Sequence, residues 1–565
     1  MQRWITTPDR HRLLHELPSL ALMHWLPELR TPAYAAGMRL VTIVAGTFAT
    51  VAVATTACAQ RPAPLRIDET TIADVHRALR ARTLTCRSLV QQYLDRIEAY
   101  DKRGPAINAL VTVNGAALAV ADSLDRRYAA SGPVGPLHCV PMIVKDNFET
   151  TDLQTTAGSL SLKGWLPSRD ATMVARVRAA GAIVLAKANL AEWAFTPYET
   201  VSSILPGYTK NPYALDRVTA GSSGGTAAAV AANEGLVGLG TDTGNSIRGP
   251  SAHQALVGIR STMGLTSRAG VVPLSNGADI AGPMARTMAD AVTVFQVVAG
   301  EDSADVVTAA GRGHRDADYS ASLVRGALQG ARIGVLRQAY ERPTTDSQVV
   351  RVFRRAVADL ATQGATMVDP AGIDSLAAVL RVSGPGCATF KHDLERYFAA
   401  RGSNAPVKTI SEVLRSGNYH PSAQLRLQAA DTVSVAPEDS PACAAREAMR
   451  VRFRAAVVQL MDSLRLDALV YPTWSNPPRL IGDLNTPHGD NSQLFSPTTG
   501  FPAITVPMGW TRDDALPAGI TFLGRPWSEG RLISLAFGYE QATHHRRPPP
   551  STPPLSMLRR NTSRR

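Results

Sequence analysis

Residues 173–190, MVARVRAAGAIVLAKANL, decide the fold, because an Ala-containing helical stretch runs directly into an apolar strand candidate. Related patterns recur in VPMIVKDN at 140–147, TAAAVAANEGLVGLGTDTG at 226–244 and ALVGIRSTMG at 255–264. Strand-like apolar runs that alternate with Ala-rich helices are typical of a sheet packed between helices. We therefore expect an α/β protein with helices on both faces of its sheet.

The flanking segments extend this pattern into one large domain at about 66–545. Residues 67–100 carry apolar residues at helical spacing with a break at Thr83, which predicts two amphipathic helices. DALVYPTW at 467–474 and FPAITVPMGW at 501–510 predict two late strands. The stretch at about 300–463 has a helical pattern, and we expect it to form a helical cap that shapes the substrate site.

Composition and charge exclude several classes of protein. The chain has 565 residues, 45% hydrophobic and 19% charged, with 43 Gly and 38 Pro, which indicates a globular protein and not a disordered one. The net charge is +12, but residues 546–565 contain six Arg and no acid, and residues 1–61 contain six Arg against three acids. The body is therefore nearly neutral, and we expect no nucleic-acid partner. The Pro- and Arg-rich segment 546–565 predicts a disordered basic tail.

The N-terminal region predicts export. From Met38 the sequence MRLVTIVAGTFATVAVATTACAQ has one Arg, a weakly apolar stretch and the small residues Ala57-Cys58-Ala59 before Gln60. This pattern indicates a signal peptide at 38–59, with a membrane-spanning helix as the alternative and Cys58 as a poor lipoprotein acceptor. We expect the natural start at Met38, residues 1–37 as a non-native extension, and a periplasmic or secreted protein with no stable membrane insertion.

Four further cysteines remain, at 86, 139, 387 and 443. An oxidising compartment permits disulfides, and Cys387 with Cys443 is the pair we favour among three full connectivities, with free buried thiols as the alternative. No Cys-x-x-Cys or Cys/His ligand spacing is present, so we expect neither a structural metal nor a cofactor.

Lys145 ends the apolar run of GPLHCVPMIVKDN at 135–147. A buried ammonium is costly unless it is paired or loses its proton, and desolvation lowers its pKa toward a value useful for a base. Lys145 is therefore a candidate general base. The alternatives are a lysine that reaches the surface or one that pairs with Asp146.

Ala220 to Thr226, AGSSGGT, form a Gly/Ser loop that opens an Ala-rich helix. Such a loop presents free amide groups, but it lacks the Gly-Lys-Ser/Thr ending of a phosphate-binding loop. It formally matches Gly-x-Ser-x-Gly with Ser223 in the centre, yet the preceding NPYALDRVTA does not resemble the buried strand that a nucleophile elbow needs. A plain helix cap is the remaining alternative.

Gly240 to Pro250, GTDTGNSIRGP, follow the apolar run LVGL. The small residues from Thr243 to Ser246 allow consecutive backbone N–H groups to converge beside the Ser246 hydroxyl. Acyl transfer needs this arrangement, because the oxyanion must meet fixed donors next to the nucleophile.

Together these three blocks closely resemble the amidase signature family, and VGIRSTMGLTSRAGVVPLS, GPMARTMADA, NPPRLIGD and FPAITVPMG extend the likeness over about 66–545. The resemblance implies a mixed central β-sheet and a catalytic trio of Lys145, Ser222 and Ser246. In that trio Ser246 attacks the amide carbonyl, Ser222 relays the proton after a cis bond to Gly221, and neutral Lys145 is the final base. The N–H groups of Thr243, Gly244, Asn245 and Ser246 are expected to form the oxyanion hole.

One position departs from the family pattern, since Asn245 stands where many members have Gly. We expect altered substrate fit and retained activity. Ser223 and Asp242 are expected to support the active-site loops, and Arg248 to order them. We expect four histidines, at 138, 253, 392 and 488, to be structural.

The predicted activity is hydrolysis of a small-molecule or peptide carboxylic amide to an acid and ammonia or an amine, through an acyl-enzyme on Ser246. The alternatives are the A subunit of a glutamyl-tRNA amidotransferase, an α/β-hydrolase-type esterase that uses Ser223, and a binding protein without turnover. The sequence is compatible with a monomer or a homodimer, and it does not identify the substrate.

Overall fold

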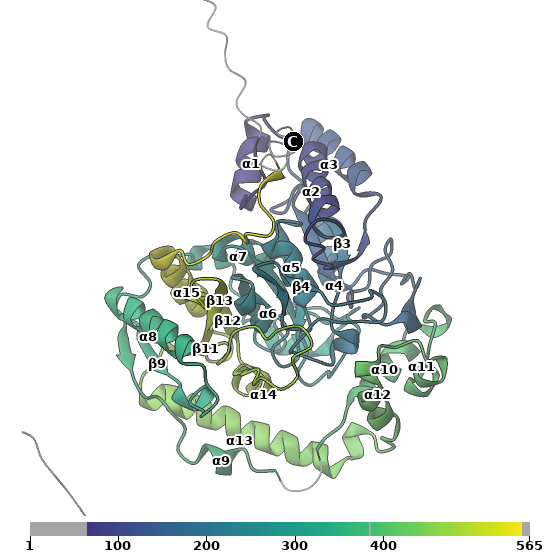
Figure 1. Cartoon of the computed structure of the whole chain (residues 1–565). Helices are drawn as coiled ribbons and strands as arrows, with labels where there is room; N and C mark the ends of the chain where they lie inside the picture. The colour runs from purple at the N-terminus through teal and green to yellow at the C-terminus, as the bar shows by residue number, and fades with distance from the viewer. Residues whose placement is uncertain (1–64, 383–385, 556–565) are drawn as a thin grey trace, which may run out of the picture. The chain divides into compact units, whose positions relative to one another are not determined.

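The computed structural model describes residues 65–382 and 386–555, which belong to one compact unit (Figure 1). The predicted extension at 1–37, the predicted signal peptide at 38–59 with Cys58, and residues 556–565 lie outside the described residues. None of the helices in the described ranges is both long enough and apolar enough to span a bilayer.

Eleven strands of the described part form one mixed sheet in the order β1-β3-β2-β6-β8-β7-β12-β13-β11-β9-β10, and β4 and β5 form a separate pair. The strands are β1 Leu110–Val113, β2 Pro141–Lys145, β3 Ile183–Ala188, β4 Lys210–Asn211, β5 Ala214–Val218, β6 Val237–Asp242, β7 Val257–Arg260, β8 Ile280–Ala285, β9 Arg332–Val335, β10 Thr366–Val368, β11 Ala468–Pro472, β12 Ala503–Thr511 and β13 Leu516–Leu523. The predicted strands are confirmed, since each of the quoted apolar runs contains one.

The helices are α1 Ile72–Arg80, α2 Cys86–Tyr100, α3 Ala117–Ser131, α4 Thr172–Ala179, α5 Gly224–Ala231, α6 Arg248–His253, α7 Met288–Val298, α8 Ser347–Thr362, α9 Leu376–Val379, α10 Phe390–Ala399, α11 Ile410–Ser416, α12 Gln424–Asp431, α13 Pro441–Ser463, α14 Phe495–Thr499 and α15 Glu529–Thr543. Thr71 and Thr85 accept the N3 amides of α1 and α2 in capping boxes. These caps explain why the predicted break at Thr83 separates two helices.

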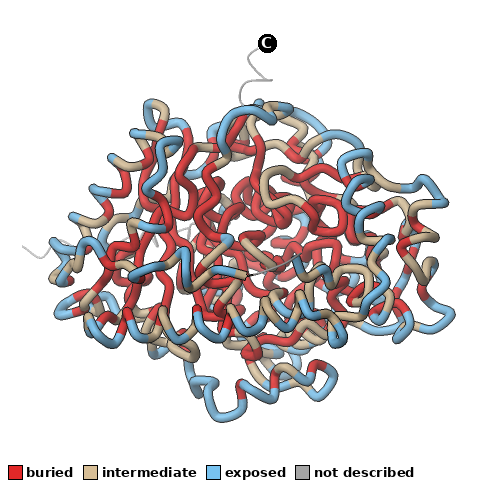
Figure 2. The backbone as a smooth tube through the Cα atoms, turned by 90° about the horizontal axis from the view of Figure 1, so that it is seen from below, coloured by how far each residue is buried: buried red, intermediate tan, exposed pale blue. Residues whose placement is uncertain are grey.

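Helices cover both faces of the sheet, as predicted. On one face α5 and α6 pack closely, because glycines of the strands make room for them: a Cβ at Gly238 would meet Thr226 at 2.5 Å, and one at Gly258 would meet Ser251 at 2.5 Å. On the other face Tyr539 of α15 packs near Phe522 of β13. Figure 2 shows the buried residues gathered in the interior of the molecule, with exposed segments around them.

The stretch at 300–463 is less uniform than its helical pattern predicts. It contains β9 and β10, which pair in parallel and extend the sheet beside β11. We use the name cap for α10, α11 and α12 with their connections, residues 390–431. These helices pack on a second hydrophobic cluster that includes Trp165, Trp193 and Phe398. The cap is therefore narrower than the sequence predicts, because short strands in this stretch join the sheet.

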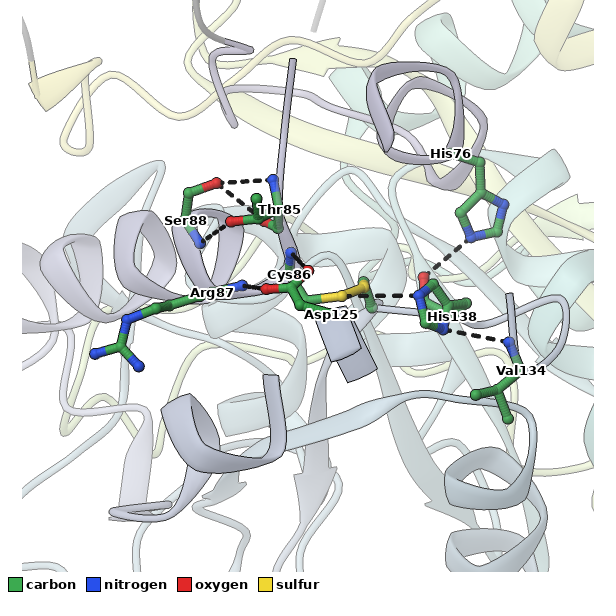
Figure 3. The surroundings of a disulfide bond; sticks show 9 residues. His76, Thr85, Cys86, Arg87, Ser88, Asp125, Val134 and His138 are labelled. Atoms are coloured by element: carbon green, nitrogen blue, oxygen red, sulfur yellow. Dashed lines mark hydrogen bonds between the residues drawn. A yellow bond between two sulfur atoms is a disulfide. The ribbon is translucent and has the colours of Figure 1, made fainter. Parts of the chain in front are cut away.

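Two disulfides cross-link the described part. Cys387 is bonded to Cys443, the pair favoured from the sequence, and Cys86 is bonded to Cys139. Cys86 is the first residue of α2, and Cys139 precedes β2 with a φ of 63°, a backbone conformation that favours glycine. Figure 3 shows this buried disulfide beside His138, whose Nε2 lies 3.8 Å from the Cys86 Sγ.

The prediction of a disordered basic tail from residue 546 onward is wrong for residues 546–555. Arg546 forms an ion pair with Glu69 at 2.7 Å, and Arg96 donates a hydrogen bond to the Thr552 carbonyl at 2.8 Å. The composition of this segment does not indicate these contacts, because they depend on partners that are distant in the sequence, Glu69 and Arg96.

Candidate active site

Lys145 lies at the carboxyl end of β2, between the parallel strands β3 and β6. Ligands of parallel sheets gather at these carboxyl ends. The side chain is fully buried, and its Nζ is 2.8 Å from the Ser222 Oγ and 2.7 Å from the Thr241 Oγ1. The prediction that Lys145 is desolvated is therefore confirmed, and the alternative of a surface lysine is wrong.

Burial lowers the pKa of Lys145 to about 7, although the negative charges of Asp279 and Asp242 act in the opposite direction. The sequence also allowed Lys145 to pair with Asp146, but Asp146 pairs instead with Lys187 at 2.9 Å. Lys145 can therefore hold its amine uncharged near neutral pH, as a general base requires.

The loop at 220–223 brings Ser222 to Lys145. The peptide bond between Gly221 and Ser222 is cis, as the family resemblance implies. Residue 221 must be glycine, because a Cβ there would lie 2.4 Å from the Glu199 carbonyl oxygen and 2.6 Å from that of Thr196. A side chain at 221 would displace Ser222 from the amine.

Ser223 ties this loop to β6. Its hydroxyl donates to the Thr241 carbonyl at 3.1 Å and accepts from the Thr241 amide at 3.3 Å. The preceding strand β5 is mostly half-buried, pairs with β4 and bridges to Leu480 through Arg217, and only its last residue, Val218, is buried. Ser223 thus has the supporting position predicted for it, and the buried strand of a nucleophile elbow is not found before it.

Asp242 anchors the turn between β6 and α6. Its carboxylate accepts the amides of Ile247 at 3.2 Å and Arg248 at 3.4 Å, and it pairs with both Arg248 and Arg260 at 3.0 Å. All three charged side chains are fully buried. Burial alone would raise the pKa of Asp242, but the two arginine charges outweigh it and lower the pKa to about 2.

Ser246 lies at the end of this turn. Among the described residues its hydroxyl makes no hydrogen bond, and 5% of the residue is exposed. Thr243, at the start of the turn, donates its hydroxyl to Asp279 at 2.5 Å. Gly244 lies under the Gln493 side chain, whose Oε1 would be 2.0 Å from a Cβ at this position. A side chain at position 244 would therefore require the Gln493 side chain to move.

Four neighbours of the site were missed by the sequence reasoning. Thr241 contacts the Lys145 amine, and the Asn147 Nδ2 donates to the Thr241 Oγ1 at 3.2 Å. Asp279 fixes Thr243, and Gln493 covers Gly244. Thr241 and Asn147 lie inside the quoted motifs, but Asp279 and Gln493 come from distant segments that carry no local signal.

The histidines lie as expected of structural residues. His253 stacks on Trp474, and burial lowers its pKa to about 3. His138 stacks on Tyr128, and His488 stacks on Tyr198. In the described ranges none of them makes a hydrogen bond to Lys145, Ser222 or Ser246, nor does His392.

Comparison with known proteins agrees with this geometry. The sequence profile of the family described as Amidase matches residues 88–533. A probable amidase of Arabidopsis thaliana is 32% identical over 505 residues, 85% of this chain and 91% of the relative. The A subunit of the glutamyl-tRNA(Gln) amidotransferase of Symbiobacterium thermophilum is 33% identical over 487 residues, 84% of this chain and 96% of the relative.

Among solved structures, the native peptide amidase of Stenotrophomonas maltophilia superposes with a TM-score of 0.77 and 36% identity, over 85% of this chain and 98% of that one. An amidase family protein of Bacillus anthracis gives a TM-score of 0.75 and 29% identity, over 86% of this chain and 92% of that one. The family profile spans the segments that hold Lys145, Ser222 and Ser246, the relatives and the fold agree with it, and the chain therefore belongs to the amidase family.

Proposed function

We propose that the protein hydrolyses a carboxylic amide through an acyl-enzyme on Ser246, with Ser222 and Lys145 as its proton relay. The observation that carries this proposal is the fully buried Lys145 amine, 2.8 Å from the Ser222 Oγ. A neutral amine at this distance can accept the Ser222 proton, and Ser222 can in turn take the proton of Ser246.

The reaction then follows serine-hydrolase logic without a histidine. The Ser246 oxygen bonds to the amide carbon, and the N–H groups of Thr243, Gly244, Asn245 and Ser246 stabilise the resulting oxyanion. The proton held on the relay passes to the leaving nitrogen as its bond to carbon breaks. A water molecule, deprotonated by the same relay, releases the acid and restores Ser246.

The substrate class that we favour is a peptide or small-molecule amide. The similarity to peptide amidase supports it, at a TM-score of 0.77 and 36% identity. Glutamine hydrolysis is the second candidate. It is favoured by the amidotransferase A subunits, of which the structure from Thermotoga maritima gives a TM-score of 0.65 and 25% identity. Assays with a peptide C-terminal amide, a simple carboxamide and free glutamine would separate these candidates.

We also propose that the protein is exported after cleavage before Gln60, and that it acts in the periplasm or outside the cell. The Ala57-Cys58-Ala59 ending of the apolar stretch from Met38 supports this. Expression of the full chain, cell fractionation and N-terminal sequencing test it. Mature protein that begins at Gln60 outside the cytoplasm is expected, and uncleaved cytoplasmic protein would contradict it.

The catalytic proposal is tested by amide hydrolysis and by fluorophosphonate labelling of four single variants. Ser246→Ala should abolish labelling, and Ser246→Ala, Ser222→Ala and Lys145→Met should each lower kcat by about 10⁴-fold or more. Ser223→Ala is the matched control, because it removes a neighbouring buried hydroxyl and should keep most of the activity. An esterase that uses Ser223 predicts the reverse order, and a binding protein predicts no turnover or labelling in the parent chain.

A further inference from the structure

Asn245 and Gly249 occupy one shared space beside Ser246. The Asn245 side chain is fully buried, and neither its Oδ1 nor its Nδ2 has a hydrogen-bond partner in the described part of the chain. A Cβ built on Gly249 would lie 2.1 Å from that Oδ1, 2.3 Å from the Nδ2 and 2.5 Å from the Cγ. With the Asn245 side chain in this position, a side chain at 249 would therefore force one of the two to move.

The reason for Asn at 245 lies in its side chain and not in its backbone. Asn245 is not among the described non-glycine residues with positive φ, so the turn does not require glycine there. An unpaired buried carboxamide destabilises the folded state. The contact that this carboxamide does make is its close packing against Gly249.

Two hydrogen bonds connect this packing to the nucleophile turn. The Gly249 amide donates to the Asn245 carbonyl at 2.8 Å, which closes the backbone around Ser246. The Gly249 carbonyl accepts the Trp474 Nε1 at 3.0 Å, so Gly249 itself is held from outside the turn. The Asn245 side chain thus packs against Gly249, which is held in place, and Ser246 lies between Asn245 and Gly249 in the chain.

We propose that Asn245 is a positioning residue whose carboxamide, packed against Gly249, holds the 244–246 turn so that the Ser246 hydroxyl and the turn amides converge on the substrate carbonyl. The inference rests on the proposed function, because it assigns a role in the same acyl transfer. Small displacements at such a site are costly, because catalysis depends on the placement of the reacting atoms.

A double-mutant cycle tests the proposal. The Asn245 atoms that a Cβ at Gly249 would meet are the Oδ1, Nδ2 and Cγ, and Asn245→Ala removes all three. Gly249→Ala should lower kcat and the rate of fluorophosphonate labelling at least tenfold with little change in KM, because the added methyl displaces the turn. Asn245→Ala should lower kcat about three- to tenfold. Gly249→Ala should have almost no further effect when Asn245→Ala is already present, so the double variant should match Asn245→Ala within threefold.

Gly519→Ala is the matched control, since its Cβ would also crowd α6, meeting the Ala252 Cβ at 2.7 Å, but has no Asn245 atom among its nearest neighbours. It should lower the thermal midpoint, and Asn245→Ala should not rescue it. Equal effects of Gly249→Ala in both backgrounds, or none, would overturn the inference. If Gly249→Ala does not fold, a soluble and active double variant supports the inference and an insoluble one overturns it. An inactive, unlabelled parent chain would instead reject the proposed function.

Discussion

The strands around Lys145 and the cap differ in how they are held together. Every residue of β2 and β6 is buried, and polar groups such as Lys145, Asp242 and Thr241 are enclosed with their partners. In the cap, α12 buries only Leu427 among its described residues. One of the attachments of the cap to the body is buried Glu149, which accepts hydrogen bonds from Tyr397 at 2.6 Å and Arg401 at 2.5 Å.

This difference indicates that the strands around Lys145 and the cap have different roles. Groups that must keep a shifted pKa and a fixed distance lie where water is excluded on all sides. The cap packs on a smaller cluster that it shares with Trp165 and Trp193, and none of its described residues hydrogen-bonds to Lys145, Ser222 or Ser246. We therefore expect substitutions in the body to change stability or kcat, and substitutions in the cap to change KM.

The largest expected effect comes from Asp242→Asn. The substitution leaves Arg248 and Arg260 buried without a charged partner, which should lower the free energy of unfolding by about 3–5 kcal/mol. Urea denaturation followed by circular dichroism measures it. Asp462→Asn is the control, because Asp462 pairs with Arg525 at the surface, where a loss of at most about 1 kcal/mol is expected. Equal losses would contradict the assigned role of the buried cluster.

The pH dependence should report the buried amine. Burial lowers the pKa of Lys145 to about 7, and only the uncharged amine can accept the serine proton. The value of kcat/KM should therefore rise about tenfold per pH unit below neutrality and level off above it. A profile from about pH 5 to about pH 9 measures this. A flat profile, or one that falls with pH, would be incompatible with a lysine base.

Thr241→Val should affect turnover more than binding. It removes the hydroxyl that contacts the Lys145 Nζ at 2.7 Å, so kcat should fall about ten- to a hundredfold while KM changes little. Steady-state kinetics measure the two separately. Thr226→Val is the control, since the Thr226 hydroxyl donates to the Leu239 carbonyl on the same strand. An equal loss of kcat in Thr226→Val would mean that the loss in Thr241→Val comes from altered packing and not from the lost contact with Lys145.

Tyr397→Phe should have the smallest effect and should act through the cap. It removes one hydrogen bond to Glu149 while Arg401 remains in place, so we expect KM to rise up to about fivefold with kcat nearly unchanged. Kinetics with a peptide amide provide the test. Tyr319→Phe, which removes a hydroxyl outside the cap, should leave KM unaltered. A drop in kcat without a change in KM would contradict the expectation that substitutions in the cap change KM and not kcat.

Much of the body could be predicted because its signals are local. The apolar run before Lys145, the Gly/Ser loop around Ser222 and the small-residue turn before Ser246 are each encoded in adjacent residues. Asp279 and Gln493 could not be found in this way, since single polar residues in unremarkable segments gain a role only when the chain brings them to the turn. The strands β9 and β10 were also missed, because short strands in a helical stretch carry little periodicity.

The sequence alone determined the α/β architecture and the family, and it supplied the residues proposed as the relay, because strand periodicity and motif spacing are properties of neighbouring residues. Only the tertiary structure decided that Lys145 is fully desolvated, that Cys86 pairs with Cys139, and that residues 546–555 pack on the body. Desolvation depends on which distant groups exclude water from a side chain, and pairing depends on which distant residues meet. Both are decided only when the chain has folded.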